Sequence, residues 1–170
     1  LNDRYYGNET IEIGAVMVTA NGDVTSEFNE FVRPIKKPIL TDFCKELTSI
    51  KQSDVDNADY FPAVWERFCN WIDNINSNAV FCSWGYYDKN QFINDCKLYN
   101  LSYDYVWFNR HISLKHQYVQ ITGNRKCGMT RALRYLKIPL IGTHHRGIDD
   151  ARNIAKILVH EKLFSQWELR

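Results

Sequence analysis

The sequence predicts one α/β domain in which helices cover a mixed β-sheet. Three observations lead to this class: a strand hairpin opens the chain, strands and helical patterns then alternate, and 45% of the 170 residues are apolar. A chain of this length can bury one substantial core, and it is short for two domains. Strands that alternate with helices are typical of a sheet covered by helices.

The opening hairpin is the clearest strand pattern. Residues 11–18, IEIGAVMV, alternate and then run apolar, as a half-buried strand does. The sequence ANGD at 20–23 contains an Asn-Gly pair, which favours a tight hairpin turn. The partner strand is EFNEFVRP at 27–34, which Pro34 ends.

Three helices are expected next. TDFCKELTSI at 41–50 and SDVDNA at 53–58 predict short helices with Thr41 and Ser53 as N-caps. DYFPAVWERFCNWIDNI at 59–75 predicts a longer helix with Pro62 in its first turn. Helical spacing places five of its side chains on one buried face: Phe61, Val64, Trp65, Phe68 and Ile72.

The second half of the chain alternates strands and helices. AVFCSW at 79–84 predicts an apolar strand, and a helix through 92–96 follows it. A weaker strand is expected around Ile112 and Leu114. Two more helices are predicted, one near MTRALRYL at 129–136 and one from Asp149, whose inward positions are Ala151, Ile154, Ala155 and Leu158.

Charge and cysteine content bear on the partners and the cellular compartment of the protein. Twenty-one basic residues nearly balance twenty acidic ones, so net charge does not indicate a nucleic-acid or membrane partner. The five cysteines are widely separated and form no Cys-x-x-Cys pair, which favours thiols in a reducing compartment. No apolar run approaches the roughly 20 residues that span a bilayer. We expect a cytoplasmic protein without a membrane partner.

The segment GTHHRGIDDARN at 142–153 contains several side chains that can transfer protons or bind ions. One interpretation is local: Gly147 makes a turn, Asp149 caps the last helix and Asp150 favours its positive end. The other is functional: His145, with an unperturbed pKa of about 6.5, takes a proton from an attacking water while Asp150 binds metal. The local pattern alone leaves both open.

Asp88 is the second candidate acid. It follows the strand at 79–84, and the carboxyl ends of strands are where open α/β sheets place their sites. An N-cap role is the structural alternative. Carboxylates are the ligands that Mg²⁺ and Mn²⁺ accept, so Asp88 and Asp150 are candidate metal ligands. Two aspartates are too few for a site with two ions, and further carboxylates are expected from elsewhere.

Candidate substrate contacts surround these residues. Arg146 lies between the proposed base and the proposed ligand, where it could hold a phosphate. Trp84, Tyr86 and Tyr87 crowd the approach to Asp88, and exposed rings stack on unpaired bases. The run NRKCGMTRALRYLK at 124–137 could guide a phosphate backbone, although a solvated helix face is its ordinary interpretation. Its cations are Arg125, Lys126, Arg131, Arg134 and Lys137.

Four segments resemble one family in order and spacing: NETIEIGAVMV, TDFCKELTSIKQSDVDNA, SWGYYDKNQFINDC and GTHHRGIDDARNIAKI. The chain resembles DEDDh-type 3′-to-5′ exonucleases of the DnaQ-like group, in particular the KapD-like and Eri-type branch. The resemblance implies a ribonuclease H-like mixed sheet, with an N-terminal antiparallel hairpin, later β-α units and helices on both faces. It also implies two divalent cations, Mg²⁺ or Mn²⁺, and a single-stranded RNA or DNA 3′ end as substrate.

The resemblance assigns roles residue by residue. Asp88 matches the second-motif aspartate, and His145 with Asp150 matches the histidine and aspartate that define the DEDDh subclass, with four residues between them. It also implies that Phe43 lies in the helix near the terminal nucleotide. The residues expected to contact substrate are Phe43, Thr48, Trp84, Tyr87 and Arg146.

The family's first motif, an Asp-x-Glu on a first central strand, has no match. Asp3, Glu9 and Glu12 are the nearby acids, and none has this pattern. We expect residues 1–170 to form a single exonuclease domain whose first strand and first-motif acids lie upstream of residue 1. The alternative is a domain that has lost its metal cage and kept the fold.

The predicted function is hydrolysis of terminal phosphodiester bonds from the 3′ end, releasing nucleoside monophosphates, with RNA slightly favoured. One rival is a catalytically dead exonuclease fold that binds nucleic acid. Another is a hydrolase of small phosphoesters that holds one metal through His144, His145 and an aspartate.

Overall fold

The computed structural model describes residues 7–169. The elements follow in the order β1 (Glu12–Val18), β2 (Val24–Phe31), α1 (Asp42–Thr48), α2 (Gln52–Asp56), α3 (Phe61–Asn76), β3 (Cys82–Ser83), α4 (Tyr87–Leu98), α5 (Val106–Asn109), β4 (Ile112–Ser113), α6 (Leu114–Thr122), α7 (Met129–Tyr135), α8 (Gly147–Leu158) and a final 3₁₀ turn (Phe164–Gln166).

The predicted hairpin is confirmed. β1 and β2 pair antiparallel from Glu12 opposite Phe31 to Val18 opposite Val24, with an irregularity after Met17. Gly22 adopts a φ of 89°, a left-handed conformation that glycine accepts without steric cost. The second strand starts earlier than the predicted position 27 and ends before Pro34.

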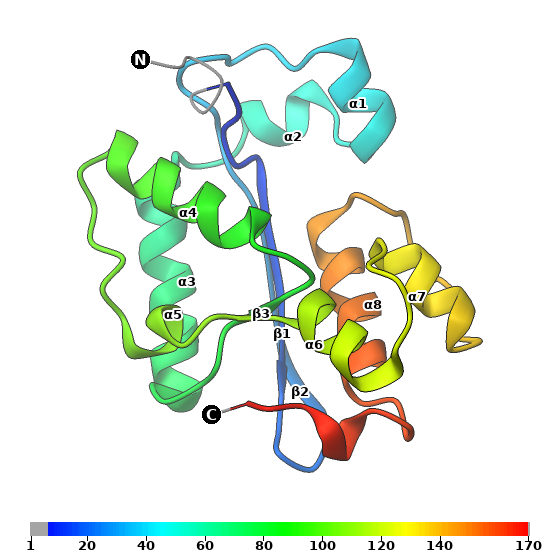
Figure 1. The fold of residues 1–170 in the computed structure, drawn as a ribbon. Helices are drawn as coiled ribbons and strands as arrows, with labels where there is room; N and C mark the ends of the chain where they lie inside the picture. The colour runs from blue at the N-terminus through cyan, green and yellow to red at the C-terminus, as the bar shows by residue number, and fades with distance from the viewer. Residues whose placement is uncertain (1–6, 170) are drawn as a thin grey trace.

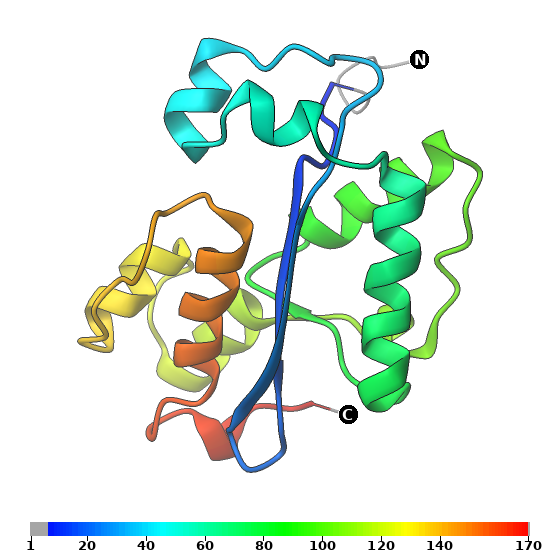
Figure 2. The ribbon, with the colours of Figure 1, turned by 180° about the vertical axis from the view of Figure 1, so that it is seen from behind.

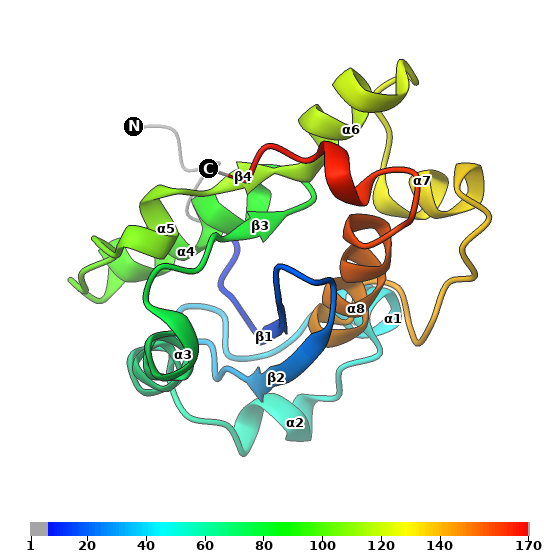
Figure 3. The same cartoon turned by 90° about the horizontal axis from the view of Figure 1, so that it is seen from below.

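The remaining strands are short. β3 and β4 pair in parallel through Cys82 with Ile112 and Ser83 with Ser113. Within residues 7–169 no strand ladder joins this pair to the hairpin, so the expected mixed sheet consists of two two-stranded sheets. Figure 3 shows the two pairs apart from each other.

Helices lie on both sides of the hairpin, as predicted. In Figure 1, α3, α4 and α5 occupy one side and α6, α7 and α8 the other, while Figure 2 shows α3 and α8 flanking the hairpin from behind. The first side buries an aromatic core that includes Phe28, Trp65 and Trp107. The second side buries Leu114, Tyr118 and Ile157 between its helices.

Most predicted helices form, with corrected ends. Thr41 caps α1, since its hydroxyl accepts from the Cys44 N–H at 3.1 Å. The predicted cap Ser53 is wrong: α2 begins at Gln52, and the Lys51 N–H donates to Asp54 at 2.8 Å. All five positions predicted to be buried in α3 are buried.

Two predictions near the C-terminal half are also corrected. Leu114 begins α6 rather than ending a strand, so three helices follow β4 instead of two. α8 begins at Gly147, not Asp149, with Arg146 at the N-cap position. Among the described helices, none has the length and apolar character needed to cross a bilayer.

Candidate active site

One carboxylate organises the loop before α8. Oδ1 of Asp150 lies 3.0 Å from Nδ1 of His144 and accepts the backbone N–H of His145 at 3.2 Å. The two imidazole rings lie 3.7 Å apart between centroids. The candidate base and the candidate ligand therefore share one centre at the start of α8.

His145 is held in an unusual backbone conformation. Its φ is 72°, in the left-handed region that non-glycine residues enter rarely and that histidine, asparagine and aspartate enter more often than other side chains. The residue is exposed, whereas its neighbour His144 is half-buried. The loop thus presents the His145 ring to solvent at a fixed position.

The donor set of this loop fits a divalent cation. One ligand atom from each of His144, His145 and Asp150 lies within 4.8 Å of the other two. Imidazole nitrogens and a carboxylate oxygen are ordinary ligands for divalent metals, and no thiolate belongs to the group.

Asp88 lies in the first turn of α4. Asp88 is an exposed residue, yet partial desolvation of its carboxyl raises its pKa, and the Asp150 carboxylate raises that pKa further. The interaction brings the two predicted ligands into one electrostatic environment. Figure 1 shows the first turns of α4 and α8 on either side of β1. Shared metal binding by Asp88 and Asp150 stays a prediction.

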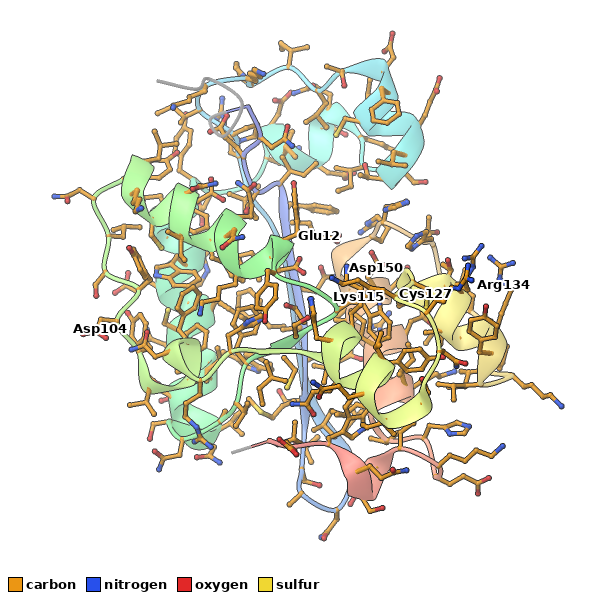
Figure 4. All side chains as sticks on the ribbon, viewed as in Figure 1. Glu12, Asp104, Lys115, Cys127, Arg134 and Asp150 are labelled. Atoms are coloured by element: carbon orange, nitrogen blue, oxygen red, sulfur yellow. The ribbon has the colours of Figure 1, made fainter. Side chains whose placement is uncertain are left out.

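Glu12 is a residue of this region that sequence reasoning missed. Its side chain is 3% exposed, forms an ion pair with Arg146 at 2.9 Å and accepts the Gly147 backbone N–H. Figure 4 shows Glu12 on β1 near the helix that carries Asp150. The sequence contained one signal for this contact. Glu12 lies on the same face of the predicted strand as Gly14, and an acid that becomes buried on that face needs a polar partner.

The Arg146 guanidinium is accordingly less available to bind a phosphate than predicted. Glu12 binds its guanidinium and raises its pKa, and the group lies 5.2 Å from the centroid of the Phe31 ring. The side chain keeps 24% exposure. Its first role in this structure is to join β1 to α8, and phosphate binding stays a prediction.

The predicted substrate aromatics fall into two classes. Phe43 and Tyr87 are 72% and 65% exposed, so their rings are available for stacking. Trp84 is 8% exposed, packs on Tyr118 and donates its indole N–H to the Cys127 carbonyl at 2.9 Å. Thr48 ends α1 and donates its hydroxyl to the Cys44 carbonyl.

The nearby acids do not supply the first motif among the described residues. Glu9 accepts three backbone N–H groups, from Ile35, Lys36 and Lys37, and so anchors the turn after β2. Asp3 lies outside the described residues.

The five cations predicted between 124 and 137 are all exposed, and Figure 4 shows one of them, Arg134, on α7.

Comparison with known proteins extends these observations. The family model described as Exonuclease (RNase_T) matches residues 2–158. The chain is 31% identical to ERI1 exoribonuclease 2 of Homo sapiens, covering 89% of this chain and 25% of the relative. It is 30% identical to 3'-5' exoribonuclease 1 of Rattus norvegicus, covering 93% and 48%. The chain thus spans a quarter to about half the length of these curated relatives.

A solved structure supports the same branch. The nuclease domain of 3'hExo, a DEDDh family member bound to rAMP, aligns with a TM-score of 0.87 and 29% identity, covering 95% of this chain and 84% of that one. The likeness confirms the predicted fold class and the resemblance to the DEDDh Eri-type branch. Exonucleases of the DEDDh group use divalent metal ions, which agrees with the donor set before α8.

Proposed function

Because this chain belongs to the exonuclease family, we propose that it hydrolyses terminal phosphodiester bonds from the 3′ end and releases nucleoside monophosphates. The observation that carries the proposal is the start of α8, where Oδ1 of Asp150 accepts the backbone N–H of the exposed His145 at 3.2 Å and lies 3.0 Å from Nδ1 of His144, so that a candidate base and a candidate metal-binding carboxylate share one centre. We include Asp88 because its carboxyl interacts electrostatically with Asp150; burial and this interaction raise the pKa of Asp88.

The chain's own residues divide the work as follows. His145, exposed on its left-handed loop, accepts a proton from the attacking water. Asp150 holds His144 through Nδ1 and the His145 backbone through its N–H, so one carboxylate orients both histidines. Asp88 and Asp150 would supply part of the ligand set for two divalent cations, Mg²⁺ or Mn²⁺. When bound, such ions neutralise phosphate charge and acidify water.

A single-stranded RNA 3′ end is the proposed substrate, with DNA as a poorer one. The exposed rings of Phe43 and Tyr87 suit unpaired bases, which contribute about 1 to 3 kcal/mol for each base that stacks. The names of both curated relatives state an exoribonuclease, and the aligned 3'hExo domain is bound to rAMP.

The first-motif acids belong to the proposal as well. We propose that a strand carrying an Asp-x-Glu pair precedes residue 1, lies between β1 and β3 and completes the metal ligands. The separation of the hairpin from the β3–β4 pair supports such a place. Sequencing the transcript upstream of Leu1 tests this, and an open reading frame that starts without such a pair rejects it.

The decisive test replaces His145 in the full-length gene product. Asparagine at 145 tolerates the left-handed backbone and removes the base, so turnover of a 5′-labelled single strand with Mn²⁺ should fall about 10² to 10⁴-fold. The thermal unfolding midpoint should stay that of the wild type, because the residue is exposed.

His144→Asn is the matched control. It loses the contact with Asp150 but leaves the proposed base, so its turnover should lie between the wild type and His145→Asn. Normal turnover in His145→Asn would reject His145 as the base. A wild-type protein that binds the strand without shortening it would favour the dead binding module.

A further inference from the structure

A basic and aromatic surface lies beside the candidate active site, at the carboxyl ends of β3 and β4. We call it the Tyr86 surface, and its members are Tyr86, Lys89, His111, Lys115, His116 and Lys126. It comes within two positions of Asp88 along the chain, and Figure 4 shows Lys115 in the first turn of α6. None of its members takes part in the proton transfer or metal binding proposed above, although the sequence already made Tyr86 and Lys126 candidate substrate contacts.

Two serine–histidine pairs form the base of this surface. Ser83 and Ser113 are register partners in the parallel pair. The Ser83 hydroxyl lies 2.7 Å from Nε2 of His111, and the Ser113 hydroxyl lies 2.6 Å from Nδ1 of His116. Both serines are buried, so the two imidazoles are anchored to the ends of the strands.

The ring of Tyr86 packs against both imidazoles. Its centroid lies 5.6 Å from that of His111 and 5.0 Å from that of His116, with tilted planes. Tyr86 nevertheless remains 51% exposed. The ring is therefore oriented by neighbours and still open to solvent, which lowers the entropy cost of stacking a ligand on it.

Three lysines lie close enough to these two imidazoles to affect their pKa values. Burial and the charge of Lys89 lower the pKa of His111 to about 4, and burial with Lys126 and Lys115 lowers the pKa of His116. Nζ of Lys115 lies 3.2 Å from the position that a Cβ on Gly85 would take. Across residues 7–169, no carboxylate forms an ion pair with Lys89, Lys115 or Lys126. Nζ of Lys89 lies 5.8 Å from the centroid of the Phe108 ring, so Lys115 and Lys126 are the cations left for an anionic ligand.

We propose that the Tyr86 surface binds single-stranded nucleic acid outside the reaction centre, with one base stacked on Tyr86 and phosphates paired with Lys115 and its neighbours. An oriented open ring flanked by unpaired cations is the combination that sequence-tolerant single-strand binding uses. The inference rests on the proposed function, since it extends the path of the same substrate. It predicts that a strand long enough to leave the reaction centre binds more tightly than a dinucleotide.

Binding in EDTA separates this inference from hydrolysis. Fluorescence anisotropy with a 5′-labelled RNA strand of about ten nucleotides, within the range that such grooves cover, reports affinity when no cleavage occurs. Tyr86→Ala should weaken binding of this strand about tenfold, while Tyr86→Phe, which keeps the ring, should bind like the wild type. Lys115→Ala should reduce the slope of log affinity against log salt by about 0.7, the value for one lost phosphate contact.

Lys97→Ala is the matched control, because Lys97 is an exposed lysine at the other end of α4. It should change neither affinity nor salt slope. The proposal is overturned if Tyr86→Ala binds the long strand normally, if Lys97→Ala weakens it as much as Lys115→Ala, or if Tyr86→Ala weakens a dinucleotide equally. A wild-type protein that binds but does not hydrolyse the strand would contradict the proposed function and leave this surface supported.

Discussion

The starts of α8 and α4 place the candidate residues by different physical means. α8 begins against the hairpin through charge: Glu12 on β1 binds Arg146 and Gly147, and Arg152 joins Glu27 of β2 to Asp149. α4 begins beside the β3–β4 pair, where Tyr86 packs on two imidazoles anchored by serines.

This difference indicates where a substitution destabilises the protein more: in the α8 half of the site, which is the start of α8 on the hairpin, or in the α4 half, which is the start of α4 beside the β3–β4 pair. The start of α8 depends on a buried carboxylate, whose loss leaves polar groups without a partner. The start of α4 depends on neutral side chains and on rings that face solvent, where a substitution leaves no buried charge behind. Damage to the α8 half should therefore cost more stability than damage to the α4 half.

The largest effect is expected where α8 touches β1. A Cβ at Gly14 would overlap the backbone of Ile148 in the first turn of α8, and backbone cannot rotate aside. Gly14→Ala should lower the free energy of unfolding by about 3 kcal/mol or more, measured by urea denaturation. Gly128→Ala is the control, because nothing lies within 4 Å of its added Cβ. Equal denaturation midpoints for the two variants would contradict direct packing of α8 on β1.

The buried ion pair should give the next effect. Glu12→Gln keeps an oxygen for the Gly147 N–H and removes the charge that holds Arg146, so the free energy of unfolding should fall by about 2 kcal/mol, as expected for hydrogen bonds that lose their charged partner. Glu12→Ala, which also removes the acceptor, should lose more. Exonuclease turnover should fall in both, because Asp150 lies in the same helical turn. Unchanged stability in Glu12→Ala would show that Arg146 and Gly147 are satisfied by water instead.

Local patterns predicted the parts of this molecule that depend on neighbours in sequence. The hairpin followed from an Asn-Gly turn, the inward face of α3 from helical spacing, and the cluster before α8 from a stretch of seven positions, 144–150. The start of α8 was misplaced because Asp149 looks like a cap, yet its carboxylate accepts the Thr143 N–H and pairs with Arg152.

Contacts between distant residues could not be predicted in this way. Glu12 and Arg146 are separated by most of the chain, and neither local sequence indicates that the two residues are in contact. The burial of Trp84 depends on Tyr118 and on the Cys127 carbonyl, which come from later elements. Both cases concern whether a side chain is available to substrate, so exposure was the property that the sequence specified least. A cytoplasmic location stays a prediction.

The smallest expected effect is a pH dependence in the α4 half. Burial and Lys89 lower the pKa of His111 to about 4, so between this value and the unfolded value of about 6.5 the unfolded chain binds a proton that the folded one does not. Its contribution to stability is therefore present at pH 7 and is lost as the pH falls. Between pH 7 and pH 5 the loss should be about 1 to 2 kcal/mol.

His111→Gln, whose amide can still donate to Ser83, should lose less stability over the same interval in urea denaturation. If the variant and the wild type lose the same amount, folding does not lower the pKa of His111, and the neutral anchoring of the start of α4 is wrong.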